Sequence, residues 1–214
     1  MSTFSTKHTY VESAFDYKRA FAGKHEFTGL ALFFADRTRS GSGFPFSKLG
    51  YAGRSTYAYK GKYLAEANIG YNGTENFAKG MRMGFFPAFS AGWLITEEAW
   101  MEKKAPWISY LKLRLSSGKV GNANIGGRRY LYLPDTWGAA TGYNFGSGAA
   151  NALGGSFELN LGNPNVTWET AWKHNIGLES MFFNKSLSVN FDVFYDNTTS
   201  AKTYESLARN DGRA

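Results

Sequence analysis

The feature that most limits the possible folds is an alternation of apolar and polar side chains with a period of two, which recurs along much of the chain. It is most regular between residues 166 and 193. Because successive side chains of a strand point to opposite faces, this pattern predicts strands with one apolar and one polar face. No apolar run approaches the roughly 20 residues of a membrane-spanning helix, so any crossing of a membrane would use strands.

A tight turn at Asn184-Lys185 predicts a closing hairpin with a fixed register. In this register apolar side chains meet apolar side chains along the whole pair, as a half-buried sheet requires. Val166 and Trp168 continue the same apolar face toward the start of the incoming strand, while His174 interrupts it. The expected apolar pairs are Phe182 with Leu187, Leu178 with Phe191, and Ile176 with Val193.

The stretch "YAYKGKYLAEANIGYNG", residues 57–73, predicts a second hairpin around Lys60-Gly61-Lys62. The register sets Tyr59 opposite Tyr63, with tyrosine and small residues on that face and charged or amide side chains on the other. A soluble sandwich and a membrane barrel would both accept such a hairpin, so this stretch alone does not choose between them.

The connections between the predicted strands alternate between short and long. Because antiparallel neighbours turn at opposite ends in succession, the tight turns gather on one rim and the long loops on the other. Strands of about ten residues with this asymmetry are typical of outer-membrane barrels. We therefore predict an all-β fold, an antiparallel up-and-down transmembrane β-barrel of which the chain forms about eight strands. The expected tight turns are at 23–24, 60–62 and 184–185, and the expected longer loops at 37–48, 73–82 and 122–165.

Aromatic residues near the strand ends favour the membrane interpretation, because aromatic girdles lie at both membrane interfaces. Expected near the short turns are Phe21, Tyr59, Tyr63, Phe182 and Phe183, and toward the long loops Tyr51, Tyr71 and Trp168. The alternative is a soluble, secreted carbohydrate-binding β-sandwich, which would bury its apolar faces in a core. A passive porin is a third, weaker option. Pro87 has no amide hydrogen and predicts a bulge or an unpaired position.

The sequence offers no support for an enzyme. His8, His25 and His174 are far apart and lack ligand spacing, so neither a metal site nor a histidine-based triad is expected. The adjacent Glu97 and Glu98 stand near lysines and are interpreted as part of a solvated turn. The glycines around residues 146–148 lack the third glycine and the strand-to-helix setting of a dinucleotide loop. No cofactor is predicted.

Charge and cysteine content remove further classes. The formal net charge of +7 comes from scattered lysines and arginines without a basic stripe, so a nucleic-acid partner is not expected. The chain has no cysteine, which excludes disulfides and thiolate metal sites.

Several ordered motifs resemble one known family. These are "GFFPAFSAGW", "YLKLR" with "GKVGN", "IGGRRYLY" and "LGNPNVTWETAW", within a similarity from about residue 10 to residue 199. They are similar to the barrel of SusC/RagA-type TonB-linked outer-membrane transporters. The resemblance implies a larger barrel with a plug in its lumen, import of oligosaccharides or peptides driven through TonB, and a SusD-like substrate-binding lipoprotein as a lid. It also implies outer-membrane lipid around the barrel.

The chain departs from that plan in several respects. We see no signal sequence, no plug and no TonB-docking segment, and expect an internal barrel fragment of a longer transporter. Residues 1–199 are predicted to be the TonB-dependent receptor-like barrel segment. Residues 200–214 are a polar tail, which we do not expect to belong to the barrel.

Two groups of residues are candidates for function. Aromatic side chains, amides and arginines of the long loop could stack on a sugar or hold a peptide, although they could equally pack the loop against its neighbours. These loop candidates are Arg128, Arg129, Tyr130, Tyr132, Trp137, Tyr143 and Phe145. The second group lies on the predicted polar face and is expected to face the lumen: Arg54, Glu66, Asn68, Glu169, Lys173 and Asp192.

Overall fold

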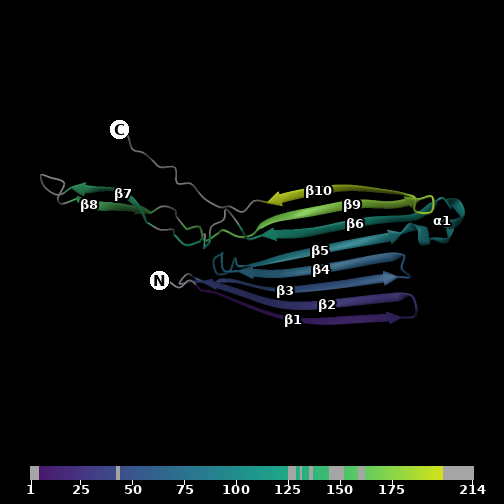
Figure 1. Cartoon of the computed structure of the whole chain (residues 1–214), viewed down its shortest axis with the longest axis horizontal. Coiled ribbons are helices and arrows are strands. Elements are labelled where there is room, and N and C mark those ends of the chain that lie inside the picture. The colour runs from purple at the N-terminus through teal and green to yellow at the C-terminus, as the bar shows by residue number, and fades with distance from the viewer. Residues whose placement is uncertain are drawn as a thin grey trace, which may run out of the picture.

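The computed structural model of the chain describes residues 5–41, 44–124, 129–130, 132–134, 137–144, 152–158 and 162–199. These residues form one eight-stranded antiparallel sheet and a separate two-stranded hairpin (Figure 1). The large sheet contains β1 (Thr6–Phe21), β2 (His25–Ser40), β3 (Phe46–Tyr59), β4 (Tyr63–Thr74), β5 (Met83–Leu94), β6 (Ile108–Asn122), β9 (Glu169–Phe182) and β10 (Leu187–Thr199). Residues 200–214 lie outside the described residues, so the tail stays a prediction.

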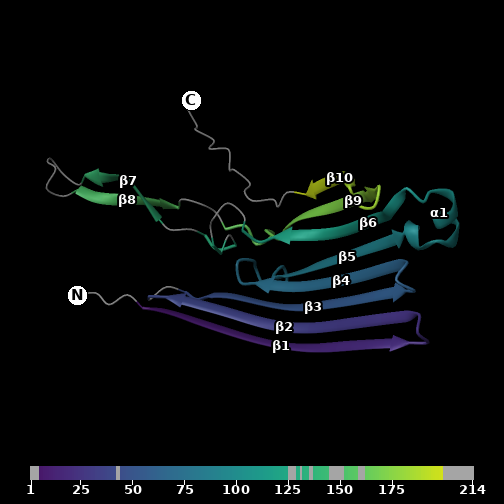
Figure 2. The same cartoon turned by 45° about the vertical axis from the view of Figure 1, so that its right-hand side comes forward.

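The sheet follows the order of the chain with one interruption. Its strand order is β1-β2-β3-β4-β5-β6-β9-β10, so that β6 pairs with β9. Between them lies the separate hairpin of β7 (Trp137–Asn144) and β8 (Ala152–Glu158), which extends beyond the end of the large sheet (Figure 2). The predicted long loop from 122 to 165 therefore contains a short strand pair, which its glycines and asparagines did not indicate.

The predicted gathering of tight turns at one end is confirmed, but the predicted loop 37–48 is mostly strand, because β2 runs to Ser40 and β3 begins at Phe46. Residues 22–24, 60–62 and 183–186 make tight turns at one end, which we call the short-turn end. The connection from β5 to β6 lies at the same end and contains the 3-10 helix η1 (Ile95–Glu97) and the helix α1 (Ala99–Lys104). The opposite end is the long-loop end. The strands of the large sheet are longer than the predicted ten residues, at 12 to 16.

Both predicted hairpin registers are confirmed. Tyr59 pairs with Tyr63 in the β3–β4 hairpin. The turn between them places Lys60 and Gly61 at φ of 51° and 67°, the conformation of the tight hairpin turns that match strand twist. In the last hairpin the predicted apolar pairs are all observed: Phe182 with Leu187, Leu178 with Phe191, and Ile176 with Val193.

Pro87 marks the place where two strands separate. It pairs with Ile69 on β4, but the β5–β6 ladder begins only at Ala88, opposite Gly118. The predicted unpaired position is thus confirmed on the β6 side. Toward the long-loop end β5 and β6 diverge, as Figure 1 shows.

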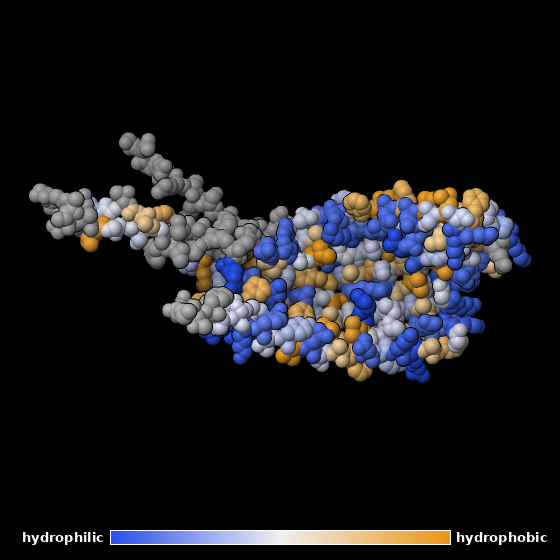
Figure 3. All heavy atoms as spheres, viewed as in Figure 1, coloured by the Kyte–Doolittle hydropathy of each residue, from blue (hydrophilic) through white to orange (hydrophobic). Residues whose placement is uncertain are grey.

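The sheet has almost no enclosed core. Among the described residues, the buried hydrophobic side chains are Phe77, Met101 and Val166, and none of them lies in a strand of the large sheet. Hydrophobic residues lie at the molecular surface beside hydrophilic ones (Figure 3). A β-sandwich would press two apolar faces together, and the described residues contain no such pair of faces. No described helix is long and apolar enough to cross a membrane.

Candidate functional site

One face of the large sheet carries a row of stacked rings along the short-turn end. Phe21 stacks on His25 with ring centroids 5.1 Å apart, and His25 contacts Tyr59 at 5.0 Å. Tyr59 stacks on Tyr63 at 6.3 Å, and Tyr63 on Trp93 at 6.4 Å. The row links β1 to β5 through neighbours in the ladder, so each strand end holds the next.

The β5–β6 connection is fastened to this row by Glu98. Its carboxylate accepts hydrogen bonds from the Tyr63 hydroxyl at 2.8 Å and from Trp93 Nε1 at 3.3 Å. Lys62 Nζ lies 3.7 Å from the same carboxylate, whose side chain is only 18% exposed. The pKa of Glu98 is lowered, mainly by the hydrogen bond from Tyr63 and further by the hydrogen bond from Trp93 and the charge of Lys62. The interpretation of Glu98 as part of a solvated turn was therefore wrong.

A second row of aromatic residues crosses the same face toward the long-loop end. In the register of β2 to β5, Phe33 lies opposite Tyr51, Tyr51 opposite Tyr71, and Tyr71 opposite Phe85. The rings of Phe33 and Tyr51 are 5.2 Å apart. Between the two rows, most side chains on this face are apolar, aromatic or small, with Arg19 on β1 as an exception, so we call it the apolar face. Examples are Ala31, Ala67, Ile69 and Phe89.

Val166 and Trp168 are not on the apolar face, which corrects the sequence prediction. Strand β9 begins only at Glu169. Val166 is fully buried against Phe77, and the Trp168 ring contacts Phe77 at 5.6 Å. Trp168 also meets Phe86 edge to face at 5.1 Å, near the place where β5 and β6 diverge. The period-two pattern failed here because these residues pack between loops, and loop packing has no strand period.

The opposite face is polar and is crossed by ion pairs. Arg114 Nε lies 2.7 Å from Glu179, and Arg114 Nη2 lies 3.1 Å from Asp192. Gly177 stands between Arg114 and Asp192 in the register of β6, β9 and β10. A Cβ at Gly177 would come within 2.6 Å of Asp192 Oδ1 and 2.9 Å of Arg114 Nη2. The glycine therefore allows one guanidinium to bridge three strands.

The six polar-face candidates all lie on this face, and each contacts another polar side chain there. Arg54 Nε donates to Asn68 Oδ1 at 3.0 Å and lies 3.7 Å from Glu66. Asp192 contacts Arg114 as described. The other two candidates pair with residues that the sequence analysis had not selected: Lys173 with Asp196 at 2.7 Å, and Glu169 with Asn122 at 3.1 Å. Arg114 was also missed, although the alternation of the "YLKLR" motif places it with Lys112 on the polar face of its strand.

The polar face is hollowed toward the short-turn end. A cavity of about 390 Å³ lies over β2 to β6 and β9, and it is open to solvent. Charged and hydroxyl side chains contribute to its lining, among them Glu26, Glu66, Lys112, Arg114 and Thr56. No group of three or more potential metal-ligating side chains is found among the described residues.

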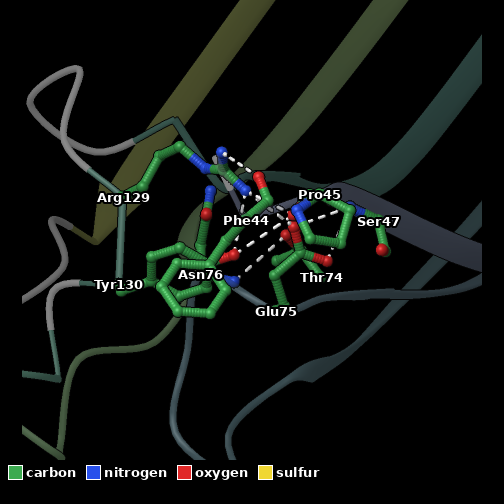
Figure 4. A network of polar contacts seen from close by, with 8 residues as sticks. All are labelled: Phe44, Pro45, Ser47, Thr74, Glu75, Asn76, Arg129 and Tyr130. Carbon is green, nitrogen blue, oxygen red and sulfur yellow. Dashed lines mark hydrogen bonds and ion pairs between the residues drawn. The ribbon is translucent and has the colours of Figure 1, made fainter. Parts of the chain in front are cut away.

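At the long-loop end, Arg129 joins three loops (Figure 4). Its guanidinium donates to the carbonyl oxygens of Pro45 at 2.7 Å and Phe44 at 3.3 Å, and it pairs with Glu75 at 3.1 Å. Glu75 in turn accepts the Ser47 amide at 2.6 Å. Arg129 is thus committed to contacts within the protein.

Tyr130 belongs to the same network. Its hydroxyl accepts a hydrogen bond from Arg129 at 3.0 Å and donates to the Pro45 carbonyl at 3.2 Å. Burial raises the pKa of Tyr130, which keeps its hydroxyl a donor. The guanidinium also lies over the Tyr130 ring, 4.8 Å from its centroid.

The structure does not gather the loop candidates into one site. Tyr132 meets Tyr130 edge to face at 6.3 Å and so borders the network. Trp137 and Tyr143 belong to β7, in the separate hairpin, where Tyr143 is 70% exposed. Arg128 and Phe145 lie outside the described residues.

Comparison with known proteins agrees with this geometry. No family model matches the chain. It is 34% identical over 160 residues to TonB-dependent receptor P26 of Formosa agariphila, covering 73% of the chain and 15% of that receptor. It is 32% identical over 149 residues to TonB-dependent receptor SusC of Bacteroides thetaiotaomicron, covering 69% of the chain and 14% of SusC. The chain is related to the TonB-dependent receptors.

A longer alignment covers 87% of the chain and 20% of TonB-dependent receptor P39 of Formosa agariphila, at 29% identity over 217 residues. The chain thus spans a fifth or less of the length of these relatives. The solved RagAB peptide importer in its closed-closed state superposes with a TM-score of 0.73 at 18% identity, over 91% of this chain and 24% of the importer chain. This likeness confirms the fold, an antiparallel up-and-down sheet that matches part of a receptor barrel.

Proposed function

We propose that the chain forms part of the wall of an outer-membrane TonB-dependent transporter that imports oligosaccharides or peptides. The observation that carries this proposal is a sheet whose apolar face lies open between two aromatic rows. A large exposed apolar surface of this kind marks contact with a membrane or a partner. Relationship to the TonB-dependent receptors supports the membrane.

The spacing of the aromatic rows fits a bilayer. His25 of the first row and Phe33 of the second lie on β2, eight residues apart. At the usual rise per residue this is about 27 Å of strand. With the tilt of strands in membrane barrels, such a length spans most of the apolar band, which is about 25 Å tall and flanked by aromatic girdles.

The polar face would then line the lumen. On this proposal Arg54, Glu66, Asn68, Glu169, Lys173 and Asp192 face the passage. Their contacts with one another and with Arg114, Asn122 and Asp196 balance charge across neighbouring strands. A lumen with paired charges offers polar substrates hydrogen-bonding groups without a strong net field.

The partners and the substrate follow the family resemblance. A SusD-like lipoprotein would capture the substrate, TonB would supply force to a plug, and outer-membrane lipid would surround the wall. RagAB, whose barrel shares this fold, is a peptide importer, which supports a peptide substrate, whereas aromatic rings among amides in the long loop also suit a sugar. Of the loop candidates, Trp137 and Tyr143 lie on β7 of the separate hairpin, and we propose both for such contacts.

A matched pair of substitutions on β5 tests the membrane assignment. Phe89 lies midway between Trp93 and Phe85, on the apolar face, and is 57% exposed. Phe89→Arg places a cation at mid-depth in lipid, which costs about 2 to 4 kcal/mol. We expect a clear loss of the protein from the outer-membrane fraction and of its heat-modifiable folded band on gels.

The control is the next residue, Ser90→Arg, on the polar face. The same cation there meets water, so assembly should stay near the wild-type level. If both variants assemble equally well, or if the wild-type protein is a soluble monomer in plain buffer, the proposal is wrong.

A further inference from the structure

A cluster of cations occupies the apolar face at the long-loop end. Lys7 lies opposite Arg39, and Arg37 is two residues from Arg39 on the same face of β2. All three residues are exposed. Like charges directly opposite one another on a sheet repel, so this arrangement is stabilised when an anion lies between them.

The nearest acidic residues do not neutralise the cluster. Among the described residues, none of these three cations forms an ion pair. Asp36 is on the opposite face, 2.8 Å from His8. Glu75 borders the cluster, but its carboxylate is held by Arg129 and the Ser47 amide.

An apolar groove lies beside the cations, on the side toward the middle of the sheet. Its volume is about 360 Å³, and Arg37 contributes to its lining. Gly73 also lines the groove, and Met83 packs so closely over it that a Cβ there would collide with Met83 Sδ. Its apolar walls are Val11, Ala35, Leu49 and Met83. The second aromatic row, with Tyr51 and Tyr71, comes next along the strands.

We propose that this end of the apolar face binds a phosphorylated membrane lipid. Its phosphate would lie among Lys7, Arg37 and Arg39, and the first part of an acyl chain would pass along the groove toward the apolar band. The cations lie outside the aromatic row, as the phosphates of a leaflet lie outside its hydrocarbon, and the groove lies between cations and row along the strands. The inference rests on the proposed function, because it requires that the apolar face meets lipid.

The test uses protein extracted from outer membranes in mild detergent. Binding of bisphosphorylated lipid A is measured by native mass spectrometry, with dephosphorylated lipid A and inorganic phosphate as comparison probes. The combined variant Lys7→Gln, Arg37→Gln and Arg39→Gln should bind bisphosphorylated lipid A on the order of 100-fold more weakly, since each cation near an anionic surface contributes about a factor of five. Wild-type protein should bind the dephosphorylated lipid and inorganic phosphate weakly.

Two control variants distinguish the contribution of the three cations to lipid binding from that of the apolar groove. Lys24→Gln, Lys60→Gln and Lys185→Gln together remove the same charge at the short-turn end and should leave binding near the wild-type level. Ala35→Phe fills the groove and should weaken the lipid but not inorganic phosphate. If the assembled triple variant retains the lipid, or if the control variant loses it equally, this inference is wrong while the proposed function stands. Absence of the wild-type protein from outer membranes would instead contradict the proposed function, and this inference with it.

Discussion

The two ends of the large sheet hold their connections in different ways. At the short-turn end, the connections are fastened to strand ends: rings stack along the ladder, and Glu98 binds Tyr63 and Trp93. At the long-loop end, the loops are fastened to one another: Phe77 packs on Val166 and Trp168, and Arg129 spans to Glu75. The connections at the short-turn end are held by residues of the sheet itself, whereas those at the long-loop end pack mainly against each other.

This difference indicates which parts of the structure can unfold without the rest of the sheet. Contacts between neighbouring strands share the cooperativity of the ladder, whereas contacts between loops can open without breaking a strand pair. We therefore expect the long-loop end to respond to single substitutions as a separate unit. Three substitutions can test this, in order of decreasing expected effect.

The largest effect is expected from Phe77→Ala. Phe77 is fully buried, and removing a buried phenyl ring costs about 3 to 5 kcal/mol. Because its contacts are with Val166 and Trp168, hydrogen exchange should speed up at 74–82 and 162–168 but not at the 55–65 hairpin. Met81→Ala, at an exposed position of the same loop, is the control. Equal loss of protection at both ends of the sheet would show that the loop core is not a separate unit.

A smaller effect is expected from Arg129→Ala. It removes the donors to Phe44, Pro45 and Glu75, and leaves a carboxylate that is only 15% exposed with the Ser47 amide as its partner. The expected cost is about 1 to 3 kcal/mol, read as faster proteolysis of the long loops. Arg129→Lys keeps the charge but loses the planar fork, so it should restore only part of the protection. Full rescue by lysine would mean that charge alone, without the planar arrangement of the guanidinium donors, holds the loops.

The smallest effect is expected from Glu98→Gln at the short-turn end, and it should depend on pH. The pKa of Glu98 is lowered in the folded protein from its ordinary value of 4.5. A lowered pKa means that the ionised carboxylate stabilises the fold above about pH 4.5 and that this contribution is lost as pH falls through the folded pKa. The variant should therefore melt slightly below wild type at pH 7 and match it in strong acid. A difference that grows as pH falls would reverse the assigned sign.

Much of the wall could be predicted from the sequence, because a strand with one apolar face repeats its information every two residues. The register of Ile176 with Val193 and of Tyr59 with Tyr63 followed from that repetition together with the tight turns. The unpaired position at Pro87 could be predicted for a different reason, because proline has no amide hydrogen to donate to a neighbouring strand.

The long-loop end could not be predicted in the same way. Trp168 continues the apolar alternation in the sequence, but its ring turns to Phe77, about ninety residues earlier in the chain. Arg129 looked like a ligand contact, because nothing local indicates that the Pro45 carbonyl lies beside it. Glu98 likewise reads as a surface residue until the fold brings Tyr63 to it. Contacts of this kind depend on which loops meet, and periodicity carries no information about that.

The pairing of β6 with β9 has a consequence for how such walls diversify. Asn122 and Glu169 are register partners and share a hydrogen bond of 3.1 Å, so the segment between them leaves the sheet and returns to it at one point. Whatever is inserted there closes on itself without displacing a strand. On the proposed function, the strand pairing of the wall would therefore be kept when this stretch is replaced, and a change in ligand contacts would be confined to it.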